Sequence, residues 1–263
     1  MEAVDPLRQV ARAQPNNVEA QYLLGNTLLM ANKLDEAIKT LSAVLVMQPD
    51  HSEARERLRV ASVRKNLLPQ LDGLRQQVAQ NPGKAAARAE LGDTYHSMGM
   101  FAEAEEEYLK LIALEPKNYD FYNRLAIIYE EWEKPDKAIE YYQKAIERKP
   151  HHVLYLSLGN AYSKQGKLDD AIKAYQMSVE LKPSFTFGLY SLGFTYLKKG
   201  QPQAAIDPLR KVLEIEPRHV YANHGLGVAY ALTGDKAAAM QQYYVLKDLN
   251  PDVAADLLRQ IPK

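Results

Sequence analysis

Residues 122–150 read YNRLAIIYEEWEKPDKAIEYYQKAIERKP. The stretch has three fixed features: a Leu followed by a small residue, an Ala followed four positions later by a large residue, and a closing Pro. Here they are Leu125-Ala126-x2-Tyr129, Ala138-x3-Tyr142 and Pro150. The closing proline recurs every 33 or 34 residues, at Pro15, Pro49, Pro82, Pro116, Pro150, Pro183, Pro217 and Pro251. This period indicates one supersecondary unit copied along the chain, in which each copy completes its buried face only against its neighbours.

Five further copies keep the same spacing. They begin at Leu24-Gly25, Leu91-Gly92, Leu158-Gly159, Leu192-Gly193 and Leu226-Gly227. Apolar residues fall at helical spacing within the units, so each unit is predicted to form two helices. The small residue after each Leu should let the partner helix come close. Turns inside the pairs are predicted at Gly99, Gly166, Gly200 and Gly234, because glycine suits the left-handed residue that ends a helix.

These motifs resemble the tetratricopeptide repeat family, and the resemblance covers nearly the whole chain. It implies an all-α, right-handed superhelical solenoid of antiparallel helix pairs, with the first helix of each pair lining a concave groove. It also implies that the chain binds other proteins and assembles complexes, and that it carries no catalytic residues of its own.

The chain is therefore predicted to be a single solenoid over residues 1–263. Its parts are an N-terminal capping helix, seven repeats and a C-terminal cap, at 3–14, 18–49, 50–83, 85–116, 119–150, 152–183, 186–217, 220–251 and 252–263. The second repeat is degenerate, because Arg59 follows Leu58 where a small residue is expected and its second half lacks the expected Ala. It is still predicted to hold two helices, the second beginning near Pro69.

Composition excludes several classes of partner. Lys plus Arg and Asp plus Glu number 33 each, so no global field favours nucleic acid or an anionic membrane surface. No apolar run reaches the length of a membrane span, so we expect no direct membrane insertion. The first residues have no signal-peptide pattern, which favours the cytoplasm. The absence of cysteine fits the periplasm equally, should the N-terminus have been trimmed.

Catalytic and metal motifs are not found. The sequence has no Walker loop, no G-x-S-x-G elbow and no H-E-x-x-H helix. His51, His151 and His219 fall in equivalent turns between repeats instead of clustering as four metal ligands. We therefore expect no enzymatic activity, no cofactor and no metal.

The candidate binding residues form a second stripe on the first helices, roughly 130° round from the core stripe. By the family resemblance this stripe faces the groove, and it becomes aromatic towards the C-terminus. Its members there are Phe187, Tyr190, Phe194 and Leu197, followed by Tyr221 and His224. Four of them, Phe187, Tyr190, Phe194 and Tyr221, are predicted to form an anchor pocket for an apolar or amphipathic peptide segment. Asn123 and Asn160 are predicted to hydrogen-bond the backbone of that segment. The alternative is that superhelical curvature or the C-terminal cap buries the stripe.

The leading functional hypothesis is a non-enzymatic scaffold or adaptor that binds a partner segment in its groove. A second hypothesis is a structural protein that stacks end to end into homo-oligomers. A third is the targeting arm of a larger enzyme, such as a glycosyltransferase, whose catalytic part lies outside this chain.

Overall fold

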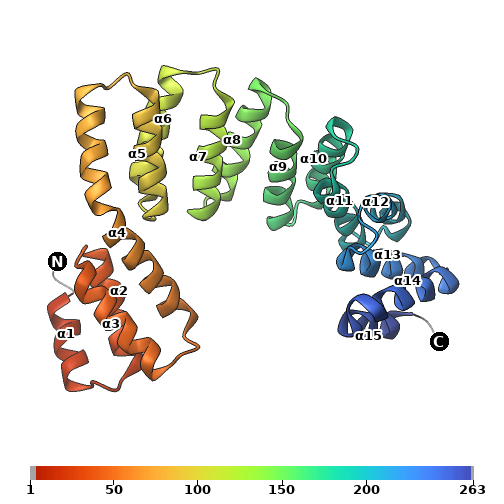
Figure 1. Cartoon of the computed structure of the whole chain (residues 1–263), viewed down its shortest axis with the longest axis horizontal. Coiled ribbons are helices and arrows are strands. Elements are labelled where there is room, and N and C mark those ends of the chain that lie inside the picture. The colour runs from red at the N-terminus through yellow and green to blue at the C-terminus, as the bar shows by residue number, and fades with distance from the viewer. Residues whose placement is uncertain (1–3, 262–263) are drawn as a thin grey trace. The chain divides into compact units, whose positions relative to one another are not determined.

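The computed structural model describes residues 4–261, and every regular element in that range is an α-helix (Figure 1). Residues 3, 262 and 263, which the predicted caps include, lie outside the described residues. The chain divides into two compact units, residues 1–116 and 117–263. Between residues 4 and 261, no helix combines the length and the apolar content that crossing a bilayer requires.

The first unit contains six helices within its described residues. They are α1 (Val4–Ala13), α2 (Val18–Met30), α3 (Leu34–Met47), α4 (Ser52–Gln80), α5 (Ala85–Ser97) and α6 (Phe101–Leu114). The pairs α2/α3 and α5/α6 are helix hairpins, and α1 packs on α2. Leu24, Leu28 and Ala37 are buried at the centre of the N-terminal core, on which α1 closes with Val4 and Ala11.

The second unit repeats the hairpin four times and ends in a single helix. Its elements are α7 (Tyr119–Glu131), α8 (Pro135–Arg148), α9 (His152–Lys164), α10 (Leu168–Leu181), α11 (Thr186–Lys198), α12 (Pro202–Ile215), α13 (Val220–Thr233), α14 (Lys236–Leu249) and α15 (Pro251–Gln260). First helices lie side by side, α9 with α11, α11 with α13 and α13 with α15. The predicted fold class, a solenoid of antiparallel helix pairs, is confirmed.

The small residue after each Leu is the point of closest helix contact. A Cβ built on Gly159 would lie 2.4 Å from Cε1 of Tyr175, and one on Gly193 would lie 2.6 Å from Cγ of Leu209. In the last pair the atom that fills this place comes from the cap, because a Cβ on Gly227 would meet Leu257 of α15 at 2.4 Å. The terminal helix therefore completes the core of the final repeat.

The turns inside the pairs have the predicted left-handed residue. Its φ is 66–87° at Gly99, Gly166, Gly200 and Gly234. Asn32 and Glu133 stand at the same place in the pairs that lack glycine, with φ of 57° and 56°. Asn tolerates this conformation better than most residues, and Glu133 adopts it because the helices on either side define the turn.

The prediction of two helices within residues 50–83 is wrong. Residues 52–80 form one continuous helix, α4, with Pro69 inside it. Ala54 near its start packs with Leu41 and Val44 of α3. Nearer its end, Arg75 donates from Nε to the hydroxyl of Tyr95 on α5 at 2.9 Å. One helix thus takes the place of a hairpin and joins the α1–α3 core to the α5/α6 pair.

Two side chains explain why this hairpin does not close. Positions 59 and 71 correspond to Gly25 and Ala37 of the first repeat, whose small size lets the two helices of that pair meet. Arg59 and Leu71 are too large for the same contact. Pro69 favours the start of a new helix, but tertiary contacts along α4 outweigh this local preference.

Replacing Gly159 with Ala tests the close contact. We expect the free energy of unfolding to fall by about 1–3 kcal/mol, because the added methyl group overlaps the Tyr175 ring. Gly73 in α4 is the matched control, since a Cβ there meets no atom within 4 Å. Gly73→Ala should raise stability by about 0.5–1 kcal/mol through helix propensity. Urea denaturation followed by circular dichroism measures both, and equal effects of the two variants would contradict the packing account.

Replacing Pro69 with Ala tests the continuity of α4. An interior proline removes a backbone hydrogen bond and clashes with the preceding turn, so Pro69→Ala should raise the unfolding free energy by about 1–3 kcal/mol. Pro135 at the first turn of α8 is the control, because its missing N–H has no helical partner to lose. A Pro69→Ala variant no more stable than the wild type would show that the chain turns at residue 69.

Candidate functional site

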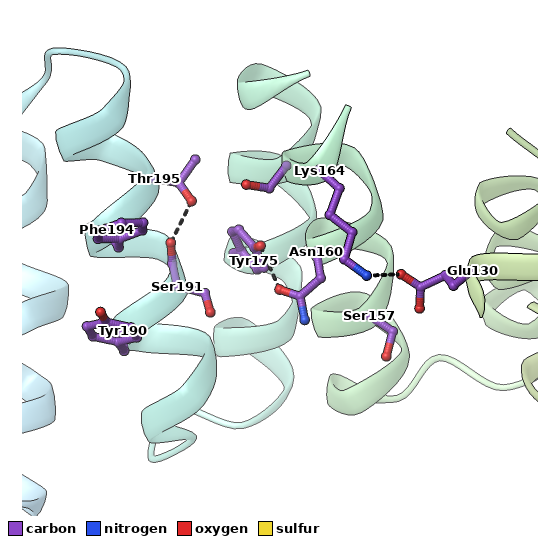
Figure 2. A pocket seen from close by; sticks show the side chains of 10 residues that line it. Glu130, Ser157, Asn160, Lys164, Tyr175, Tyr190, Ser191, Phe194 and Thr195 are labelled. Atoms are coloured by element: carbon purple, nitrogen blue, oxygen red, sulfur yellow. Dashed lines mark hydrogen bonds and ion pairs between the residues drawn. The ribbon is translucent and has the colours of Figure 1, made fainter. Parts of the chain in front are cut away.

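The second unit contains a cavity of about 320 Å³ that opens between its first helices (Figure 2). Its walls come from α7, α9, α10 and α11. The lining residues are Glu130, Ser157, Asn160, Ser163, Lys164, Tyr175, Tyr190, Ser191, Phe194 and Thr195. Figure 2 shows Tyr190 and Phe194 on one helix, with Ser191 and Thr195 of the same helix on the side nearer Tyr175 and Asn160.

Asn160 lies on the polar side of the cavity, where Tyr175 fixes its orientation. The Tyr175 hydroxyl donates to Oδ1 of Asn160 at 2.8 Å. The amide nitrogen of Asn160 has no hydrogen-bond partner among residues 4–261, and the side chain is exposed. Because its oxygen is already occupied, Asn160 presents a hydrogen-bond donor to whatever enters the cavity.

Glu130 and Lys164 form a neutral polar edge beside Asn160. Lys164 Nζ lies 3.0 Å from Oε1 of Glu130, and the hydroxyl of Tyr142 donates to Oε2 of the same carboxylate at 2.6 Å. Burial of Tyr142, and then its hydrogen bond to Glu130, raises the pKa of this phenol. The cavity therefore has polar groups without a net charge that would select a charged ligand.

The other side of the cavity continues into an aromatic surface, formed by Phe187, Tyr190, Phe194 and Tyr221. The rings of Tyr190 and Phe194 are stacked, with centroids 5.9 Å apart and planes at 19°. Phe187 is 70% exposed, Phe194 47% and Tyr221 64%. Tyr190 is half-buried, and burial, followed by the nearby Tyr221, raises its pKa. Most of this surface is open to solvent. The alternative, in which superhelical curvature or the C-terminal cap covers these residues, therefore does not hold for Phe187, Phe194 and Tyr221.

The change from polar to aromatic side chains coincides with a pair of exchanges between two neighbouring repeats. Phe194 occupies the position of Asn160 one repeat later, and Leu209 occupies that of Tyr175. The hydrogen-bonded Tyr–Asn pair is thus replaced by an apolar Leu–Phe pair.

The predicted site residues divide into three groups. Asn160, Tyr190 and Phe194 line the cavity, and Phe187 and Tyr221 extend it as the exposed part of the aromatic surface. Leu197 instead packs in the apolar core shared by α11, α12 and α13. His224 lies 3.0 Å from a carboxylate oxygen of Asp256 on α15, and Asn123 is half-buried on α7 outside the cavity.

Tyr175 and Lys164 are cavity residues that sequence reasoning did not select. Tyr175 is the large residue of the Ala-x3-Tyr motif in its repeat. The signal that could have identified it is the acceptor on the facing helix, because Tyr108 also donates to the equivalent Asp93 in the first unit. Among the described residues, no group of three or more His, Asp or Glu side chains is placed to hold a metal ion.

Sequence models of the tetratricopeptide repeat match five segments of the chain. The segments are residues 2–59, 85–118, 119–152, 153–185 and 190–254. The chain belongs to the tetratricopeptide repeat family. The longest unmatched stretch, residues 60–84, contains the second part of α4, where the hairpin is lost. The repeat is generally a non-enzymatic interaction module, and this member is accordingly a protein-interaction scaffold.

Two curated relatives match shorter parts of the chain. Human protein O-mannosyl-transferase TMTC3 is 26% identical over 165 residues, which are 56% of this chain and 18% of that protein. Regulatory protein RapK of Bacillus subtilis (strain 168) is 35% identical over 71 residues, which are 24% of this chain and 19% of RapK. The matches span about a fifth of the length of these relatives.

Solved structures share the fold. The MamA protein has a TM-score of 0.58 at 24% identity, over 65% of this chain and 94% of MamA. The C-terminal part of a TPR repeat-containing protein from Cytophaga hutchinsonii has a TM-score of 0.63 at 18% identity, over 90% of this chain and 99% of that one.

Replacing Tyr175 with Phe tests the role of its hydroxyl. Burial raises the pKa of Tyr175 from 10.0 to about 12. A folded-state pKa above that of the unfolded chain means that this tyrosine stabilises the fold below pH 10 and loses that contribution as the pH rises towards 12. Tyr175→Phe should therefore lose less stability than the wild type between pH 9.5 and 11.5. At pH 7 it should cost about 1 kcal/mol, from the lost hydrogen bond to Asn160. Denaturant titrations at each pH measure the unfolding free energy of both proteins. The same dependence of that free energy on pH in the wild type and in Tyr175→Phe would contradict the prediction.

Proposed function

We propose that this chain is a non-enzymatic adaptor that binds a segment of a partner protein at the cavity and aromatic surface of its second unit. The observation that carries the proposal is the exposure of Phe187, Phe194 and Tyr221 beside a cavity with a pre-oriented amide donor, Asn160. Soluble proteins rarely leave several large rings exposed together unless the surface is used.

Asn160 and the aromatic surface favour a partner segment that is apolar or amphipathic. The free amide nitrogen of Asn160 suits a main-chain carbonyl, whereas the Glu130–Lys164 pair satisfies its own charges. The rings of Phe187 and Phe194 suit apolar side chains on the same segment. This combination of a backbone contact and apolar anchors selects for sequence pattern more than for charge.

The apolar area also sets the expected affinity. Covering each exposed ring is worth about 1.5–3 kcal/mol. Association costs roughly 4–15 kcal/mol before any net binding appears, so the rings need the polar contacts to reach an affinity near micromolar. This range fits an adaptor that exchanges its partners.

The third hypothesis also has an observation in its favour. The match to TMTC3 covers less than a fifth of a protein named as a transferase, so a repeat array of this kind occurs within a larger enzyme. If this chain is part of such a protein, the same surface would serve as its targeting arm.

Peptide display tests the proposal. We expect random peptides selected on the full chain to share apolar side chains, and the double variant Phe187→Ser/Phe194→Ser to weaken their binding by about a hundredfold. Tyr244→Ser is the matched control, because Tyr244 is 60% exposed on α14, outside the cavity. Its affinity should equal that of the wild type.

Circular dichroism establishes that both variants keep their helices. The adaptor proposal fails if the double variant retains full affinity, or if Tyr244→Ser weakens binding as much as the double variant does.

A further inference from the structure

The N-cap residue of the first helix occupies an equivalent position in each repeat, but the type of residue there differs from repeat to repeat. The residues at this position are Asn17, His51, Lys84, Asn118, His151, Phe185 and His219. Asn17 and Asn118 cap their helices conventionally, accepting backbone N–H groups at 3.0 and 3.2 Å. The three histidines do the same through a ring nitrogen.

Each histidine cap accepts at Nδ1. The donors are the backbone N–H of Ala54 to His51 at 3.4 Å, of Val153 to His151 at 3.3 Å and of Ala222 to His219 at 3.1 Å. Only an imidazole whose Nδ1 is unprotonated can accept these bonds. A protonated ring becomes a donor at both nitrogens and places a positive charge at the positive end of the helix dipole. Imidazoles in general change charge between pH 5 and 8, so these caps depend on pH, whereas the asparagine caps do not.

The surroundings of the three histidines differ. His51 has a carboxylate oxygen of Glu53 at 3.2 Å, which can hold the ring when it is protonated. His151 stacks on His152, whose own pKa is lowered by burial and then by His151 and Lys182. His219 contacts the ring of Tyr190 on α11, at 5.3 Å between centroids. Within residues 4–261, neither His151 nor His219 forms an ion pair. A protonated His51 would therefore have a counter-ion, whereas a protonated His151 or His219 would have none among residues 4–261.

His151 and His219 cap α9 and α13, two of the helices that carry the candidate site. Tyr221 lies two residues after His219, in the first turn of α13, and Tyr190 packs directly on the His219 ring. In α9, the first turn after His151 carries the exposed Val153. Loss of the α13 cap would free the turn that positions Tyr221 and charge the ring beside Tyr190.

We infer that His151 and His219 make the surface of the second unit pH-sensitive: their neutral rings order the first turns of α9 and α13, and a ring that gains a proton releases its turn, which at α13 displaces Tyr221. The effect on partner binding rests on the proposed function. The effect on the helix caps does not.

Amide hydrogen exchange of the full chain, read by NMR at pH 7.5 and 5.5, tests the inference. The chain supplies its own control substitution, because Asn caps the equivalent helices at Asn17 and Asn118. His219→Asn should keep α13 capped at both pH values. At pH 5.5 the Ala222 amide of the wild type should exchange about fivefold faster than that of His219→Asn, which corresponds to the loss of one cap. At pH 7.5 the two should agree.

Comparison at equal pH cancels the intrinsic pH dependence of exchange and any response of the His224–Asp256 pair, which both proteins contain. The Val153 amide should behave in the same way in His151→Asn. Equal exchange at Ala222 in the wild type and His219→Asn at pH 5.5 would overturn the inference.

Binding of a display-selected peptide provides the second readout. The wild type should bind it about fivefold more weakly at pH 5.5 than His219→Asn does. Faster Ala222 exchange with unchanged peptide affinity would overturn the link between the cap and the aromatic surface. If no peptide is selected, the proposed function is contradicted. The exchange of the Ala222 amide would still test whether protonation of His219 removes the helix cap.

Discussion

The structure depends on one contact within each helix pair. A small residue on the first helix packs against a large residue on the second. In the α9/α10 pair it joins Gly159 to the ring of Tyr175, and in the α11/α12 pair it joins Gly193 to Leu209. The contact brings the helices of a pair together and so creates a face on which the next pair packs. Where it is lost, at Arg59 and Leu71, the chain forms a single long helix instead of a hairpin.

The same contact connects the core with the surface that we propose for binding. In the α9/α10 pair the large residue, Tyr175, packs past Gly159, and its hydroxyl hydrogen-bonds Asn160, which lines the cavity. In the α11/α12 pair a leucine stands in place of this tyrosine, and Phe194 occupies the position of Asn160. The polar cavity and the aromatic surface therefore belong to two neighbouring repeats that differ both at this core position and at the position facing it.

Much of the fold could be predicted from the sequence, because it depends on a local pattern that recurs. The helix pairs, the left-handed turns and the small residues at the close contacts all follow from residue type and spacing. Residues 50–83 could not be predicted in this way. Their proline suggested a hairpin, whereas the structure has one helix, α4, which packs against both α3 and α5.

The candidate site was predictable only in part, for a related reason. Helical periodicity placed Tyr190, Phe194 and Asn160 on one face, and the structure brings these three together in the cavity. Periodicity cannot show which members of a stripe are used internally, as Leu197 is by the core and His224 by Asp256. Nor could it show that the residue before the first turn of α13 caps that helix, since capping depends on the rotamer of His219.

The most direct test of the binding surface uses fluorine NMR of the chain labelled with fluorophenylalanine. The chain has five phenylalanines, of which Phe185, Phe187 and Phe194 lie at or beside the aromatic surface, whereas Phe101 and Phe121 lie elsewhere. Addition of a bound peptide should shift the resonances of Phe187 and Phe194 and leave those of Phe101 and Phe121 in place. A peptide that binds without moving the Phe187 and Phe194 resonances would contradict the account.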